Sequence, residues 1–314
     1  MNPTMSRRNF LHQAAAAVVA APLVAQAAPL FRVVDTHTHF YDTERPEGVP
    51  FPSKGTPLYR QVLPKDWLDV AAPFGALETV VVEASNWLED NQWILDLAAK
   101  NRSIVGFIGH LSPQDADFSK HLKRFADNPI FRGIRVSGDD FLKHVDKPEF
   151  QSGAKLMADL GLTLDINGAP SLHPHSAKLA ATIPSLRIVI NHVGIAGDAA
   201  HLTDEWRSGM KALGAHKNVF CKVSALTEQT DQSNKQHGSG PRETAYYLPT
   251  LDHCWNSFGP SRLVYGSNWP VCEKGGSYAD QFKIASEYFT AKGSKAAEKF
   301  FWKNSRQAYH WLQR

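Results

Sequence analysis

The stretch Phe31-Arg32-Val33-Val34-Asp35 is the first of eight short apolar runs that recur along this chain. The runs are rich in Val, Ile, Leu and Phe without strict alternation, which is typical of strands buried on both faces of a parallel sheet. We predict strands at 31–35, 79–83, 104–108, 133–136, 162–166, 187–191, 219–223 and 263–265.

Segments compatible with helices lie between these runs. They span 91–100, 118–127, 149–160, 177–182, 204–213 and 244–255, and closing helices are predicted at 278–290 and 295–312. Strand and helix in repeated alternation, with right-handed crossovers, wind into a (β/α)8 barrel. We therefore predict an α/β fold of the TIM-barrel type, as a single domain over residues 28–314. An open doubly wound sheet is the alternative, but no Gly-x-Gly-x-x-Gly follows the first run.

The composition is that of a globular protein. Of the 314 residues, 43% are hydrophobic and 21% charged, which argues against a mainly disordered or fibrous chain. The formal net charge of +3 gives no footprint for nucleic acid or a membrane surface. Cys221, Cys254 and Cys272 are too few and too irregularly spaced for a disulfide scaffold or a cysteine-rich zinc site, although one disulfide stays open.

The first 27 residues have the plan of an export signal. Arg7 and Arg8 precede an apolar run over 14–24 that ends in Ala25-Gln26-Ala27. Adjacent arginines followed by Phe-Leu are similar to the twin-arginine type, which is read by a transporter of folded proteins. The apolar run is too short to span about 30 Å of hydrocarbon. We expect removal of the signal after about Ala27, twin-arginine export machinery as a partner, a periplasmic location and no stable membrane insertion.

Two long loops follow predicted strands, which in a barrel places them over the catalytic end. The loop at 40–64 is rich in proline and should be irregular but stiff. The loop at 227–242 is polar and contains glycine, so we expect it to be mobile.

The first strand is followed by a His-x-His pattern in Asp35-Thr36-His37-Thr38-His39-Phe40. Because strand side chains alternate, His37 and His39 should point to the same side, together with Asp35. Two neutral imidazoles so placed can both reach one divalent ion at about 2.0–2.1 Å. A second pattern, His173-Pro174-His175, is expected in a loop near the entrance, because Pro174 argues against a chelate at a strand end.

Polar groups also follow the other predicted strands, where barrel active sites are built. A ring of such groups is expensive to desolvate without a function. Its members are Glu83, His110, Arg135, Asp165, Asn167, His192, Lys222, Ser224 and Asn268.

Five motifs together resemble the amidohydrolase-related family of metal-dependent hydrolases, particularly its branch of fuconolactonases and other lactone hydrolases. They are Asp-Thr-His-Thr-His-Phe at 35–40, Val-Glu-Ala at 82–84, Gly-Ile-Arg at 133–135, Ile-Asn-His-Val-Gly at 190–194 and Gly-Ser-Asn-Trp-Pro-Val at 266–271. The resemblance implies a barrel whose metal or substrate centre uses His37, His39, His192 and the position of Asn268. It implies a divalent metal, provisionally zinc, and a small-molecule substrate, although a metal-independent site stays open.

Asn268 departs from the Gly-Ser-Asp-Trp-Pro pattern that is commoner in the resembled family. An aspartate would bind metal strongly and accept a proton from the attacking water. An amide cannot act as that base, although its oxygen can ligate weakly or orient water. We take Glu83 as the first substitute for the base, because it ends the second strand beside the histidine pair, and Asp165 as the second.

Three further residues are candidates for substrate binding. Arg135 can hold a substrate carboxylate or polarise a lactone carbonyl through its forked guanidinium, and a structural ion pair with Asp139 or Asp165 is the alternative. Alternation leaves open whether Lys222 lies inside the barrel mouth or points outward. Trp269 could form a pocket wall, although aromatic residues at such positions also serve packing.

The sequence therefore predicts an exported, metal-dependent hydrolase of small lactones, either sugar-derived or carboxylated. Two other classes stay open. Relatives in the wider family decarboxylate unsaturated or aromatic acids with a similar centre, and Asn268 would also fit a catalytically impaired barrel that binds a small molecule.

Overall fold

The computed structural model describes residues 31–314, so the predicted export signal lies outside the described residues. Eight parallel strands follow one another in chain order around a single sheet. They are β1 Val33–Thr38, β2 Ala76–Val82, β3 Ile104–Gly109, β4 Phe131–Ser137, β5 Thr163–Asn167, β6 Arg187–Ile190, β7 Val219–Val223 and β8 Leu263–Tyr265. A bridge between Thr38 and Trp269 joins the last strand to the first. The predicted (β/α)8 barrel is confirmed.

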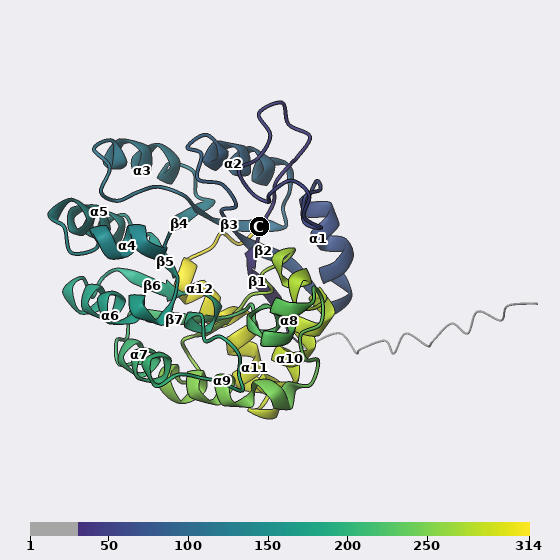
Figure 1. Ribbon diagram of the computed structural model, residues 1–314. Helices are drawn as coiled ribbons and strands as arrows, with labels where there is room; N and C mark the ends of the chain where they lie inside the picture. Colours follow the sequence, from purple (N-terminus) through teal and green to yellow (C-terminus); the bar gives the residue numbers. More distant parts are fainter. Residues whose placement is uncertain (1–30) are drawn as a thin grey trace, which may run out of the picture.

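Helices surround this ring of strands, as Figure 1 shows. The α-helices are α1 Pro64–Ala71, α2 Asp90–Lys100, α3 Phe118–Ala126, α4 Gly138–His144, α5 Pro148–Asp159, α6 His173–Thr182, α7 Asp204–Gly214, α8 Asp231–Lys235, α9 Thr244–Phe258, α10 Tyr278–Ala291, α11 Ser294–Glu298 and α12 Asn304–Tyr309. Short turns are η1 Ala72–Phe74, η2 Pro170–Leu172, η3 His192–Gly194, η4 Thr227–Gln229, η5 Val271–Lys274 and the π-helical η6 Lys299–Lys303. The predicted helices are present, whereas α1, α4 and α8 were not predicted.

The loop predicted around His173-Pro174-His175 is wrong. These residues form the first turn of α6, where a proline is favoured because its missing N–H needs no helical partner. The His173 side chain is buried, and its Nε2 lies 3.0 Å from the carbonyl oxygen of Gly194. It therefore serves the packing of α6 against the segment after β6.

Apolar side chains fill two layers, one between strands and helices and one inside the barrel. The inner cluster comprises Val34, Val80, Val82, Val105, Ile108, Val189, Phe220, Val264, Ala308, Tyr309 and Trp311. Its last three members come from α12 and the segment after it, and Figure 1 shows α12 within the ring of strands. The end of the barrel interior that α12 and the segment after it occupy is thus apolar. Within residues 31–314, no helix combines the length and apolar character that a bilayer span needs.

The register of β1 against β2 is irregular between Asp35 and Thr38. This irregularity breaks the alternation expected for the first strand. The Asp35 carboxylate accepts from the backbone N–H of Ser267, at 2.9 Å, and from Nε1 of Trp67 on α1, at 3.4 Å. Asp35 therefore does not share the face of His37, contrary to the prediction, and instead ties β1 to its neighbours.

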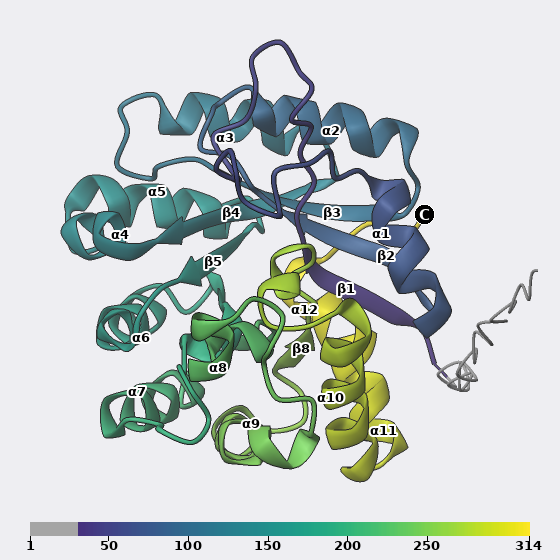
Figure 2. The same cartoon turned by 45° about the vertical axis from the view of Figure 1, so that its right-hand side comes forward.

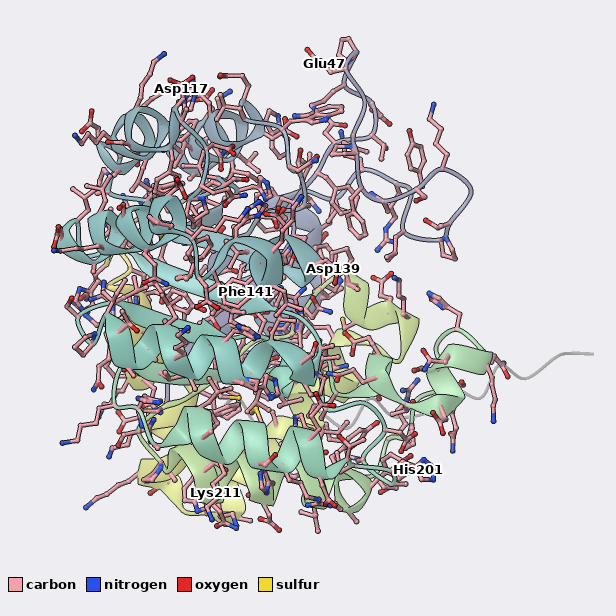
Figure 3. The ribbon with its side chains drawn as sticks, turned by 60° about the vertical axis from the view of Figure 1, so that its left-hand side comes forward. Glu47, Asp117, Asp139, Phe141, His201 and Lys211 are labelled. Atoms are coloured by element: carbon pink, nitrogen blue, oxygen red, sulfur yellow. The ribbon has the colours of Figure 1, made fainter. Side chains whose placement is uncertain are left out.

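The two long loops are both anchored to the body of the protein. The loop after β1 stands out beside α2 in Figure 2 and is held there by an ion pair of 2.8 Å between Arg45 and Asp90. The loop after β7, expected to be mobile, contains η4 and α8, and the N–H of Gly240 donates to the carbonyl of Gly275 at 2.8 Å. In Figure 3, Glu47, Asp139 and His201 lie to the right of Asp117, Phe141 and Lys211. The first three follow β1, β4 and β6, so the segments after these strands leave the barrel on the same side.

Candidate metal centre and active site

Three imidazoles meet at the ends of β1 and β6. The ring centroids of His37 and His192 are 4.4 Å apart, and those of His37 and His39 are 4.9 Å apart. All three side chains are buried, with at most 7% of their surface exposed. The predicted convergence of these histidines from two distant strands is therefore confirmed.

Closure of the barrel brings residue 268 to the same place. The backbone N–H of Asn268 donates to the carbonyl of His37 at 2.8 Å, and the N–H of His39 donates to the carbonyl of Trp269 at 2.9 Å. Gly266 makes this approach possible, because a Cβ there would lie 2.8 Å from Cβ of His37. Asn268 has a φ of 62°, a left-handed conformation that asparagine tolerates better than most residues.

The ring of His39 is oriented by two backbone carbonyls. Its Nδ1 lies 3.0 Å from the oxygen of Val82 and 3.2 Å from that of Glu83. Carbonyl oxygens only accept, so Nδ1 carries the proton and Nε2 has a free lone pair. That Nε2 faces Oδ1 of Asn268 at 3.3 Å, which brings two acceptors together. Two lone pairs in this arrangement favour a cation between or beside them.

His192 and His37 also use one nitrogen for orientation and leave the other free. Nδ1 of His192 lies 2.9 Å from Oγ of Ser224 at the end of β7. Nε2 of His37 is buried and has no hydrogen-bond partner among the described residues. A buried nitrogen without a partner is costly, and this one lies where a cation would satisfy it.

Backbone strain is concentrated at the same end of the barrel. His192, Val193, Ala225 and Asn268 all have φ values between 49° and 62°, and they follow β6, β7 and β8. Left-handed conformations of residues other than glycine are uncommon and gather at functional sites. The strain thus marks the same end of the barrel as the histidines.

Lys222 and Asp165 form a buried pair beneath His37. Nζ of Lys222 lies 3.0 Å from Oδ2 of Asp165 and 3.2 Å from Nδ1 of His37, and both residues are fully buried. Oδ2 of Asp165 also accepts from Nδ2 of Asn191 and from the Tyr309 hydroxyl. Lys222 therefore lies inside the barrel, which resolves the alternative left by the sequence, and Asp165 is its counter-ion.

Burial lowers the pKa of Lys222, whereas the charge and the hydrogen bond of Asp165 raise it. A neutral amine can accept from Nδ1–H of His37, which leaves Nε2 free to bind a cation. An ammonium group would instead donate to Nδ1 and place the proton on Nε2. The position of the proton on His37 is therefore coupled to the charge of Lys222.

Glu83 and Arg135 form an ion pair at the rim of the barrel. Nε of Arg135 donates to Oε1 of Glu83 at 2.8 Å, and Nη2 donates to the Glu83 carbonyl at 2.9 Å. Nη1 of Arg135 and Oε2 of Glu83 make no hydrogen bond within residues 31–314, so each keeps one free edge. The partner of Arg135 is thus neither Asp139 nor Asp165. Nδ1 of His110 lies 4.0 Å from Oε1 of Glu83.

The imidazoles of this centre are neutral. Burial is the main cause that lowers the pKa of His37, His39 and His192, and for His39 the value falls to about 3. The positive charges of Arg135 and Lys222 lower the pKa values of His37 and His192 further. Neutral imidazole is the form that binds divalent first-row metals. The residues present therefore fit a divalent cation.

A second group of potential ligands lies elsewhere. Asp198, His201 and Asp231 bring their potential ligand atoms within 4.8 Å of one another. Both Asp198 oxygens already accept from backbone N–H groups, those of Ala200 and Asp231, at 2.8 Å and 2.7 Å. The nitrogens of the three histidines are spread more widely, so a cation among them requires small side-chain movements. Their neutrality and the unpartnered nitrogen nevertheless make them the candidate centre.

Comparison with known proteins now decides the family. A family model described as Amidohydrolase matches residues 34–311. The chain belongs to the amidohydrolase family. The resemblance drawn from the five motifs is thereby confirmed, and membership agrees with the prediction of an enzyme of the hydrolase class.

Relatives of this amidohydrolase include two curated lactonases. An L-fucono-1,5-lactonase of Burkholderia ambifaria is 30% identical over 252 residues, covering 79% of this chain and 83% of that protein. Another, of Burkholderia multivorans, is 24% identical over 287 residues, covering 86% and 92%. A Burkholderia multivorans amidohydrolase with bound Zn superposes with a TM-score of 0.80 at 21% identity, covering 89% of this chain and 99% of that one. At that identity, the structural likeness supports the fold alone.

Two residues that were predicted to bind substrate, Trp269 and Lys222, are buried and have little access to a substrate in this amidohydrolase. Trp269 is 3% exposed and belongs to the outer core, so its part is packing and barrel closure. Lys222 is beneath the histidines. A narrow pocket lies beside Glu83 instead of over the histidines, between the loop after β1 and α2. It is lined mainly by apolar side chains, including Phe40, Tyr41, Phe51, Trp93 and Phe107.

Sequence reasoning missed one residue of the site, Glu228 on η4. Its Oε1 accepts from Nδ2 of Asn268 at 2.9 Å. The only signal in the sequence is that Glu228 is the first carboxylate after the seventh strand. Its position depends on how the loop after β7 folds, which local patterning does not indicate.

Proposed function

We propose that this amidohydrolase hydrolyses a small lactone at a centre that binds a divalent cation, with zinc as the first candidate. The observation that carries the proposal is the meeting of three neutral imidazoles and the Asn268 amide oxygen at the catalytic end of the barrel. A cation bound there would polarise the ester carbonyl and lower the pKa of water. The names of the curated relatives support a lactone as substrate class.

His37, His39 and His192 would hold the cation, and the Glu83–Arg135 pair would act on substrate and water. Nη1 of Arg135 is free to bind a carboxylate or hydroxyl of the lactone. The free Oε2 of Glu83 can accept the proton of the attacking water. That proton is then returned to the ring oxygen as the ester bond breaks, so the product is a hydroxy acid.

Metal content and hydrolysis of sugar-derived lactones test this proposal together. The unmodified protein should bind a divalent cation and hydrolyse a lactone, and the double variant His37→Ala/His39→Ala should lose both. His175→Ala is the matched control, because His175 lies on α6 with a 40% exposed side chain. Unchanged hydrolysis in the double variant would remove the cation from the mechanism.

A second candidate function is suggested by Asn268. If the barrel is catalytically impaired, the natural protein should bind lactones without turnover, and Asn268→Asp should introduce hydrolysis. Rapid turnover by the natural protein would exclude this candidate. Release of carbon dioxide from a carboxylated substrate, without ester cleavage, would instead identify a decarboxylase.

We also propose that residues 1–27 direct export to the periplasm through the twin-arginine machinery. The proposal is supported by Arg7 and Arg8 before the apolar run. Replacing both arginines with lysine should retain the uncleaved chain in the cytoplasm. Normal signal removal and export of that variant would contradict the assignment.

A further inference from the structure

We propose that Glu228 is a positioning residue that turns the side-chain amide of Asn268, so that its oxygen faces the cation centre. The inference rests on the cation centre of the proposed function and adds a residue to it. It concerns the one position at which this chain departs from the commoner aspartate.

The contacts of Glu228 leave its carboxylate surrounded by donors. Oε1 accepts from Nδ2 of Asn268 at 2.9 Å. Oε2 accepts from Nε2 of Gln281 on α10 at 2.7 Å and from Oγ1 of Thr227 at 3.2 Å. Both oxygens of Glu228 accept from these donors, so the nitrogen edge of the Asn268 amide faces Glu228 and its oxygen edge faces away.

The other edge of the same amide faces His39. Because Nδ1 of His39 donates to backbone carbonyls, its Nε2 is a lone pair, and Oδ1 of Asn268 lies 3.3 Å from it. If the amide were turned over, Nδ2 would donate to this lone pair and close a hydrogen bond. Both groups would then be lost as cation ligands. Glu228 therefore determines which edge of the Asn268 amide faces the centre. In one orientation Oδ1 is available to a cation, and in the other Nδ2 donates to Nε2 of His39.

Glu228 is itself held by the surrounding chain. It lies on η4, and a Cβ at Gly275, just after η5, would lie 2.5 Å from its backbone nitrogen. Gln281 is 2% exposed, so the donor behind the carboxylate is fixed as well. A carboxylate clamped in this way can orient the amide that it contacts.

The pairing of an amide with a carboxylate also predicts how the two positions depend on each other. Asn268→Asp alone would place a second carboxylate against Glu228, and two like charges in contact repel. Glu228→Gln in the same chain would supply an amide N–H to the new carboxylate. The hydrogen bond would be restored with its polarity reversed.

The test is the cation affinity of metal-free protein, measured by calorimetric titration with zinc and cobalt(II) and by the visible absorption of bound cobalt(II). Glu228→Ala should weaken binding by about 10- to 100-fold, as is typical when a partner of a metal ligand is removed. Glu228→Gln should weaken it less. Glu273→Gln is the matched control, because this carboxylate lies on η5 and pairs with Arg60 near the surface. Its effect should stay within about twofold.

The double variant supplies the decisive comparison. Asn268→Asp/Glu228→Gln should bind cobalt(II) at least about tenfold more tightly than Asn268→Asp alone, although it carries one negative charge fewer. If Glu228→Ala fails to fold, Glu228→Gln and the double variant still carry the test. Equal affinities of Glu228→Gln and Glu273→Gln, or a double variant no tighter than Asn268→Asp, would overturn the role of Glu228. Absence of cation binding by the unmodified protein would instead overturn the proposed centre itself.

Discussion

Glu228 is a carboxylate packed behind Asn268, and burial raises its pKa from 4.5 to about 7, against the lowering effect of its hydrogen bonds. A pKa that is higher in the folded than in the unfolded chain means that the folded protein binds the proton more tightly. The contribution of the Glu228 proton to the free energy of unfolding is therefore complete below pH 4.5 and is lost as the pH rises through 7. In metal-free protein, the free energy of unfolding should therefore fall with pH relative to that of Glu228→Gln. Urea denaturation from pH 4 to 8 measures this, and parallel curves for the two proteins would contradict it.

Single residues differ in how far the sequence could locate them. His37, His39 and His192 follow predicted strands, so strand ends and family motifs sufficed to bring them together. The prediction that Asp35 points to the same side as His37 was wrong, because the register of β1 against β2 slips locally. Composition does not reveal such a slip. Glu228 lies in a loop whose path is set by contacts with η5 and α10, and such long-range contacts leave no local pattern.

At the scale of elements, the strands were predictable because each is a buried apolar run. α8 was not, since it has five polar residues and no apolar face. It is stabilised locally by the Thr230 side chain, which accepts from the N–H of Ser233. α6 begins at His173, earlier than the predicted residue 177, because Pro174 was interpreted as a breaker although it suits the first turn of a helix.

The contact between β1 and the segment after β8 depends on a glycine. In Gly266→Ala, the added Cβ would lie 2.8 Å from Cβ of His37 and 3.2 Å from Cδ of Lys222, closer than carbon atoms pack. We expect the free energy of unfolding to fall by about 1–3 kcal/mol, and cation affinity to fall as His37 is displaced. Gly106→Ala on β3 is the control, because its added Cβ would lie 3.2–3.4 Å from atoms of Arg132, Val80 and Trp311 and therefore requires smaller shifts. Denaturation and zinc titration of both variants check this, and equal behaviour would refute the close-approach argument.

Across the whole molecule, the barrel interior divides into a polar end and an apolar end. His37, Lys222 and Asp165 occupy the catalytic side, and the inner apolar cluster fills the other. The count of eight apolar runs predicted closure, which in turn predicted that residues far apart in sequence would meet at one rim. It did not predict that Tyr309 would enter the barrel and bond to Asp165, because the 295–312 segment was predicted as a closing helix and none of its residues was placed inside the barrel.

The segment after α12 seals the apolar end, and its contribution can be measured without touching the site. Trp311 is 2% exposed, donates from Nε1 to Oγ of Ser305 at 3.0 Å, and stacks under the guanidinium of Arg32, 4.8 Å from the ring. Trp311→Ala should therefore lower the free energy of unfolding by about 3–5 kcal/mol through the cavity that it leaves. Leu312→Ala should change it by only about 0.5 kcal/mol, because Leu312 is 36% exposed and its backbone bond to Val105 is kept.

Urea denaturation compares the stability of the two variants Trp311→Ala and Leu312→Ala. The cation affinity of the folded protein should stay unchanged in both, since the histidines lie at the opposite end of the barrel. A loss of affinity in Trp311→Ala without loss of stability would show that the two ends are coupled, contrary to this division of the barrel.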